Sequence, residues 1–114
     1  MSSKRTGTKA AKERETFARV YGSAERVAWM RRQPCLVCSG LPSENAHTRS
    51  GGTGRKGDAD SIVPLCHYHH AQLHRVGVKS FQTDHAINFF VAALRVDARY
   101  EAFETWCADN PESF

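Results

Sequence analysis

The chain has 114 residues, which is enough for one domain and too few for two. It contains no run of about 18 apolar residues, so the sequence predicts no membrane span. Its basic N-terminus lacks the apolar stretch of a secretory signal, and we therefore expect the protein in a reducing cytoplasm. Four cysteines in that compartment favour metal binding over disulfides.

The net charge of +4 is unevenly distributed along the chain. Residues 1–32 carry nine Lys and Arg against three Asp and Glu, whereas residues 33–114 carry seven against nine. A basic segment ahead of a nearly neutral body suits a polyanionic partner, most simply a nucleic acid. A solvated tail that keeps the protein soluble explains the same pattern equally well.

The N-terminal segment, residues 1–16, is basic and almost free of apolar side chains, which predicts a disordered arm ahead of one domain over 17–114. An apolar segment begins at Phe17 and breaks at Gly22. Ser23 is a good N-cap for a short helix over 24–32, which Pro34 ends.

The domain core, residues 35–76, is dense in Cys, His and Gly and predicts a knuckle, a strand, a loop, a second strand and a helix. The β-branched pair Ile62-Val63 starts the second strand, and Pro64 keeps that strand short. The glycine-rich loop before it is basic. The last element is a helix over 67–76 that Gly77 closes.

The C-terminal region, residues 80–109, predicts helix with one apolar stripe, and a break near Asp97 would also fit the pattern. The stripe indicates core packing, and Asn110-Pro111 stops the helix. Its members recur at three- and four-residue steps: Phe89, Ala93, Val96, Tyr100, Phe103 and Cys107 or Trp106.

Two pairs of metal ligands lie about 30 residues apart, namely Cys35 with Cys38 and Cys66 with His69. Zinc takes four such ligands in a tetrahedron, and two pairs leave no position for water. The spacing therefore predicts a structural zinc site that pins the knuckle to the start of the helix. Its binding energy is part of the folding energy.

The fourth ligand has a rival in His67, but neighbouring side chains such as Cys66 and His67 converge on one metal less readily than residues three apart. We therefore favour His69. Cys107 stands outside the pattern and fits core packing. His85 fits no motif, and we expect it at the surface or in the core.

Three further histidines, His47, His70 and His74, form a second candidate site. His70 and His74 are four residues apart and share one helix face, so they can bind one ion. His47 precedes the glycine-rich loop, and the zinc site would bring its segment against the helix. An imidazole base and an ion with open positions are what phosphodiester hydrolysis needs. Each histidine could instead be structural.

The residues of this region resemble the HNH family of nucleases, also called ββα-metal or His-Me finger nucleases. The resemblance covers residues 35–75 and lies in the segments CLVC, ENAHTRSGGTGRKGDADSIVPLC and HYHHAQLH. It is closest to the small HNH proteins of phages and prophages. The resemblance implies an α+β fold, with a zinc-stapled ββα-metal core and flanking helices.

The resemblance also implies the roles of individual residues. The general base falls on His47 and a metal ligand on His70, with His74 as a further ligand. Where many members carry a metal ligand directly before the base, this chain has Ala46. The middle Asn of the motif has no clear equivalent, so the residues that could orient His47 or assist the metal are Asp58, Asp60 and Ser61.

These patterns together predict a metal-dependent endonuclease that hydrolyses DNA. The expected ions are structural Zn²⁺ and catalytic Mg²⁺ or Mn²⁺, which Zn²⁺ or Ni²⁺ could replace. Arg49, Arg55 and Lys56 are expected to contact phosphates, and a larger phage complex is a conceivable partner. One alternative is a non-catalytic, zinc-stabilised DNA-binding module, and another is a small interaction protein that uses its C-terminal stripe.

Overall fold

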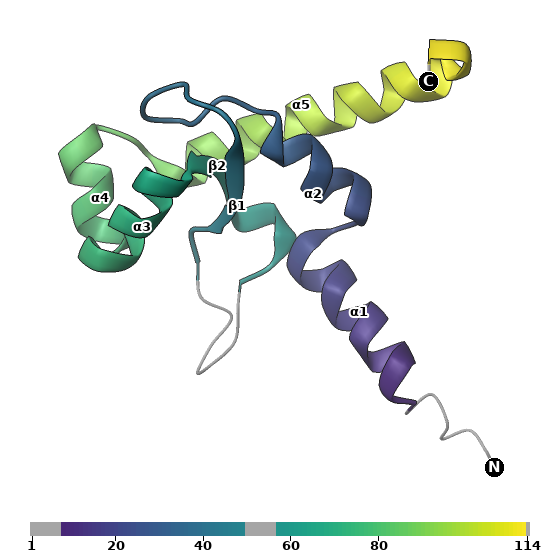
Figure 1. The fold of residues 1–114 in the computed structure, drawn as a ribbon, viewed down its shortest axis with the longest axis horizontal. Helices are drawn as coiled ribbons and strands as arrows, with labels where there is room; N and C mark the ends of the chain where they lie inside the picture. The colour runs from purple at the N-terminus through teal and green to yellow at the C-terminus, as the bar shows by residue number, and fades with distance from the viewer. Residues whose placement is uncertain (1–7, 50–56, 114) are drawn as a thin grey trace.

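A computed structural model describes residues 8–49 and 57–113 of the chain. Figure 1 shows a short hairpin in the centre of the molecule with helices packed around it. The elements in chain order are α1 (Lys9–Tyr21), α2 (Ala24–Arg31), β1 (Ser43–His47), η2 (Ala59–Ser61), β2 (Ile62–Cys66), α3 (His67–Val76), α4 (Val78–His85), α5 (Phe89–Asp109) and η3 (Pro111–Ser113).

Strands β1 and β2 pair antiparallel as a two-stranded sheet, with Ser43 opposite Cys66 and His47 opposite Ile62. Pro64 is tolerated in β2 because each strand of a two-stranded sheet is an edge strand. Helix α3 follows β2 directly, and Gly77 ends it with a φ of 87°. The predicted α+β fold with a hairpin followed by a helix is confirmed.

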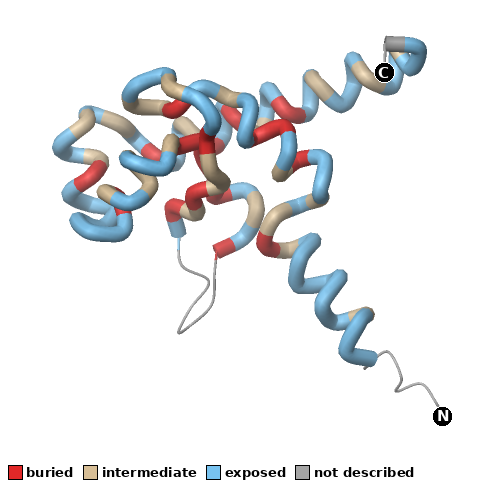
Figure 2. Tube along the Cα trace, in the orientation of Figure 1, coloured by how far each residue is buried: buried red, intermediate tan, exposed pale blue. Residues whose placement is uncertain are grey.

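Two apolar clusters flank the hairpin and hold it in place. In the first, Ala46, Val63 and Leu65 of the strands pack with Leu73 and with the aromatic residues at α4 and the start of α5. In the second, Ile62 packs with Trp29 and Met30 of α2 and with the middle of α5. Figure 2 shows this buried centre and the exposed surfaces of α1 and the C-terminal half of α5, which project from the body.

The expectation of a disordered arm through residue 16 is wrong for its described part, because helix α1 begins at Lys9. The side chain of Thr8 caps the helix by accepting a hydrogen bond from the backbone amide of Ala11, at 3.1 Å. The first turns are rich in Ala, Lys, Glu and Arg, which have high helix propensity. Local propensity and the cap therefore outweigh the lack of apolar residues.

The C-terminal region is helical as predicted, but it divides after His85 and not at Asp97. Ala86 adopts the left-handed conformation, and the Asn88 side chain caps α5 by accepting from the amide of Val91 at 3.0 Å. Asp97 lies within the unbroken α5, where its carboxylate pairs with Arg26. Among the helices of the described residues, none is long and apolar enough to cross a membrane.

Candidate functional site

The first cluster brings the two predicted pairs of ligands together. The ligand atoms of Cys35, Cys38, Cys66 and His69 all lie within 4.8 Å of one another. The Sγ atom of Cys66 lies 3.3 Å from Nδ1 of His69 and 3.8 Å from Sγ of Cys38. This Cys₃His group can hold a structural metal such as zinc. The rival ligand His67 is 87% exposed and contacts Glu44 instead.

The knuckle between the first two cysteines is tied to the hairpin. Ser39 takes a left-handed φ of 63°, and the amide of Cys35 donates to the carbonyl of Gly40 at 3.1 Å, which closes the turn. The amide of Leu36 donates to the carbonyl of Pro64 in β2. The backbone, not only the side chains, therefore sets the knuckle beside the start of α3.

The pKa shifts of Cys35 and His69 favour metal binding by this cluster. Burial acts to raise the pKa of the Cys35 thiol, but hydrogen bonds from the backbone amides of Cys66, Cys38 and Val37 outweigh it and lower that pKa. Burial also lowers the pKa of His69, with a further contribution from His85. A thiolate and a neutral imidazole are the forms that bind metal, so these two shifts point the same way. For Cys38 the hydrogen bond from the backbone of Gly40 lowers the pKa, but burial and the side chains of Cys66 and Cys35 outweigh it, so this pKa is instead raised.

The second cluster gathers around Glu44, a residue that the sequence analysis did not single out. One carboxylate oxygen of Glu44 lies 2.7 Å from Nδ1 of His70, and the other lies 3.0 Å from Nδ1 of His67. The hydrogen bond with His70, followed by that with His67, lowers the pKa of the Glu44 carboxyl. The Nε2 atoms of His70 and His74 face each other at 3.2 Å.

His47 lies at the end of β1 and faces the other way. Side chains alternate along a strand, so Glu44 and Ala46 share the face toward α3, while Asn45 and His47 share the opposite face. Accordingly, the Asn45 amide donates to the carbonyl of Val27 in α2. Nε2 of His47 lies 2.7 Å from the carbonyl oxygen of Val20, and the ring packs edge-on against Tyr21.

The three predicted histidines are therefore not drawn into one group. Within residues 8–49 and 57–113, it is the Cys₃His cluster that brings three or more candidate ligand atoms within 4.8 Å of one another, and His47, His70 and His74 do not form such a group. His70 and His74 do form a close pair on α3, as the four-residue spacing predicts. Ala46 is buried in the core beside Leu73. Its methyl side chain cannot bind a metal, so the position directly before His47 offers no ligand.

The residues predicted to orient His47 have described partners elsewhere. Asp58 pairs with Arg19 at 3.0 Å, and Asp60 pairs with Arg49 at 2.6 Å. The buried Ser61 hydroxyl donates to the carbonyl of Asp58. The other two predicted phosphate contacts, Arg55 and Lys56, lie outside the described residues.

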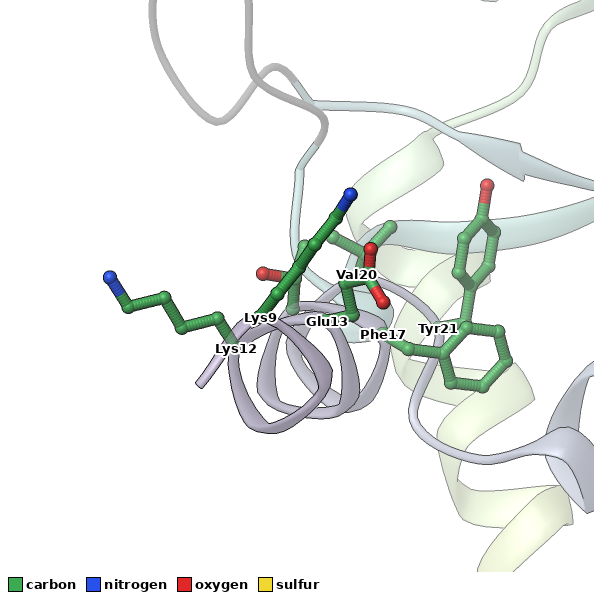
Figure 3. Close-up of a pocket in the computed structure, with 7 residues that line it drawn as sticks. Lys9, Lys12, Glu13, Phe17, Val20 and Tyr21 are labelled. Atoms are coloured by element: carbon green, nitrogen blue, oxygen red, sulfur yellow. The ribbon is translucent and has the colours of Figure 1, made fainter. Parts of the chain in front are cut away.

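Figure 3 shows a hollow along α1 whose lining includes Tyr21, and the ring of Tyr21 packs edge-on against His47. Lys9 and Lys12 line its N-terminal part. The rings of Phe17 and Tyr21 lie side by side farther along the helix, with centroids 5.3 Å apart. The hollow thus combines two lysines and the carboxylate of Glu13 with an aromatic surface that contacts the histidine of β1.

The fold and its clusters define a small α+β domain in which a ββα unit is built beside a Cys₃His group that can hold a metal. A family model described as "Putative HNHc nuclease" matches residues 12–102, which is most of the chain. The chain belongs to this HNHc nuclease family.

One curated relative gives a partial match. A stretch of 50 residues, 40% of this chain, is 38% identical to "Uncharacterized protein YdfU" of Escherichia coli (strain K12). The chain spans 14% of the length of that relative. No solved structure matches the chain.

Proposed function

We propose that this protein is a metal-dependent endonuclease that hydrolyses the phosphodiester bonds of DNA, with His47 as general base. Membership of an HNHc nuclease family supports the reaction class. The contact between His47 and the Val20 carbonyl is the observation that supports His47 as the general base. A carbonyl oxygen only accepts, so Nε2 bears the hydrogen and Nδ1 keeps the lone pair that can take a proton.

The position of Val20 explains why its carbonyl is available. It lies in the last turn of α1, where backbone carbonyls have no partner within the helix. The ring of His47 supplies the missing hydrogen bond, which fixes both its orientation and its tautomer. In the proposed reaction Nδ1 removes a proton from water as the water attacks phosphorus, and a 5′-phosphate and a 3′-hydroxyl result.

The ion of this reaction would be held by His70 and His74, which contact the face of the hairpin opposite to that of His47, so the proposal requires the scissile phosphate to reach both. Their Nε2 atoms are 3.2 Å apart, which suits two ligands of one ion, and two protein ligands leave positions open for phosphate and water. When bound, Mg²⁺ or Mn²⁺ supplies positive charge that stabilises the phosphate oxygens and the leaving 3′-oxygen. Zn²⁺ or Ni²⁺ also suits imidazole donors, and Zn²⁺ suits the structural Cys₃His group.

The hollow along α1 and the exposed Arg49 would guide the DNA backbone toward His47. Lys9 and Lys12 face this hollow, and Arg49 keeps 59% of its side chain exposed beside its partner Asp60. Contacts of this kind position a duplex without reading its sequence, so we expect low sequence specificity. We further predict that the protein is cytoplasmic, in a bacterium or an infected host. We also predict that it can take part in a larger phage complex.

The test is nicking of supercoiled plasmid by zinc-loaded protein with added Mg²⁺, Mn²⁺ or Ni²⁺, and with EDTA as control. The proposal expects nicks that need the added ion and carry 5′-phosphate ends. DNA binding without cutting by a folded, zinc-containing protein would instead support the non-catalytic DNA-binding module.

A further inference from the structure

The carboxylate of Glu44 joins β1 to the histidines of α3 through both of its oxygens. Oε1 meets Nδ1 of His70 at 2.7 Å, and Oε2 meets Nδ1 of His67 at 3.0 Å. His67 and His70 are three residues apart in the first turns of α3, so they present their rings to the same strand. The carboxylate is thereby held in one orientation.

We propose that Glu44 is a positioning residue that prepares His70 to bind a divalent ion, an inference that rests on the ion site of the proposed function. A carboxylate only accepts hydrogen bonds, so the short contact places the hydrogen of a neutral His70 on Nδ1. The lone pair of His70 then lies on Nε2, the atom that faces His74. A ligating histidine held through its other nitrogen by a carboxylate is a recurrent arrangement in metal sites.

The spacing of the two Nε2 atoms agrees with this assignment. Zinc–nitrogen bonds of about 2.0–2.1 Å in a tetrahedral site place two ligand nitrogens roughly 3.3 Å apart. The observed separation between His70 and His74 is 3.2 Å, so an ion needs little rearrangement of either ring. The negative charge on Glu44 also increases the electron density that His70 offers to a cation.

The surroundings of His70 make the contact with Glu44 more than a surface ion pair. The side chain of His70 is 20% exposed and that of Glu44 is 39% exposed, whereas His67 is 87% exposed. Partial burial strengthens a charge-assisted hydrogen bond. His67 therefore serves to hold the second carboxylate oxygen, and its loss is expected to matter less than the loss of Glu44.

The experiment measures ion binding and not cutting. Mn²⁺ is titrated into zinc-loaded protein by electron paramagnetic resonance, and the ring nitrogens of His70 are followed by long-range proton–nitrogen NMR without Mn²⁺. The variants are Glu44→Ala and Glu44→Gln, with Glu101→Gln on the exposed face of α5 as matched control. Zinc content and the thermal midpoint show whether each variant folds.

In Glu44→Ala we expect the Kd for Mn²⁺ to rise about 10- to 100-fold, as is common when such a partner is removed. The hydrogen of His70 should also move from Nδ1 toward a mixture of both nitrogens. Glu44→Gln keeps an acceptor without the charge, so its Kd should rise less. His67→Ala should raise the Kd only a few-fold, and Glu101→Gln should leave it unchanged.

Three results would overturn the inference: unchanged Mn²⁺ affinity in Glu44→Ala, no measurable Mn²⁺ binding by the wild type, or a wild-type His70 that carries its hydrogen on Nε2. Equal and complete loss of binding in the Ala and Gln variants, without a change at His70, would make Glu44 a direct ligand and also overturn it. A wild type that never cuts DNA but shows the expected Glu44 effects would refute the nuclease alone.

Discussion

Nε2 of His47 on β1 lies 2.7 Å from the backbone carbonyl of Val20, in the last turn of α1. The N-terminal helix therefore contacts the proposed base through a backbone carbonyl, and the ring of Tyr21 at the end of the same helix packs edge-on against it. This contact joins two segments 27 residues apart, and it makes the orientation of His47 depend on the end of α1 being helical.

A proline inside α1 tests this dependence. Ala18→Pro removes a helical hydrogen bond at an exposed position and should disrupt the last turn, at a cost of about 3 kcal/mol in helix stability. We expect cleavage to fall at least about ten-fold with zinc content unchanged. Ala10→Pro, in the first turn where proline is tolerated, is the control. Equal activity of both variants in plasmid nicking would show that α1 does not orient His47.

The Cys₃His group should hold one zinc per chain and carry much of the stability. Cys38 is exposed, so Cys38→Ser removes a ligand without removing core packing. Loss of a structural metal should cost more than about 4 kcal/mol of the free energy of unfolding. Cys107→Ser, outside the cluster, should keep the zinc. Elemental analysis and urea unfolding measure both effects, and a Cys38→Ser protein with full zinc would contradict the assignment.

Arg26 joins three parts of the fold and should be important for stability. Its side chain is 10% exposed, pairs with Asp97, donates to the carbonyl of Ala59 and lies over the ring of Tyr100. Arg26→Ala leaves Asp97 unpaired, with an expected loss of about 3 kcal/mol in urea unfolding. Arg31→Ala on the exposed side of α2 should change stability by less than about 0.5 kcal/mol. Similar values for the two variants would refute the role of Arg26.

Acid should weaken the contacts of Glu44. Hydrogen bonds with His70 and His67 lower the pKa of its carboxyl from 4.5, so the unfolded chain binds this proton more readily than the folded one. The contribution of Glu44 to stability is therefore present above pH 4.5 and is lost as the pH falls through the lower, folded-state pKa. The difference in unfolding free energy between wild type and Glu44→Gln should shrink below pH 4.5. A constant difference would contradict the pairing.

Binding to DNA should depend on salt through α1. Each phosphate contact contributes about 0.9 to the slope of log K against log salt on duplex DNA. Replacing Lys9 and Lys12 with Ala should lower the slope by nearly two if both contact phosphates. Lys79→Ala on the exposed surface of α4 is the control. Fluorescence anisotropy at several salt concentrations measures the slope, and an unchanged slope would place the DNA elsewhere.

The Cys₃His group, the hairpin and helix α3 could be predicted because their signals are local. Two ligand pairs of fixed spacing and a closing Gly77 are visible within a few residues. The contact of His47 could not be predicted, because its partner is a backbone carbonyl 27 residues away and no side-chain motif marks it. The prediction for the described part of the arm was wrong because its polarity favours disorder, whereas the Thr8 cap and the helix-forming residues that follow stabilise α1.

Glu44 could have been found from the strand pattern. It shares a face with Ala46, two residues later, and the register of β1 against β2 brings it beside the start of α3. The motif spacing does not mark Glu44, because the ligand position of the resembled family is the residue directly before His47, which here is Ala46. The sequence also marks the boundary between α4 and α5, but more weakly. Asn88 is a good N-cap, and an apolar helix follows it.

The most direct test of the proposed base compares plasmid nicking by the wild type and His47→Gln, both loaded with zinc and supplied with Mn²⁺. The amide of Gln can still donate to the Val20 carbonyl, but it cannot take a proton from water, so the fold is kept while the chemistry is removed. We predict at least about a 100-fold slower rate in the variant, with unchanged zinc content and DNA affinity. A His47→Gln protein that nicks DNA at the wild-type rate would contradict the account.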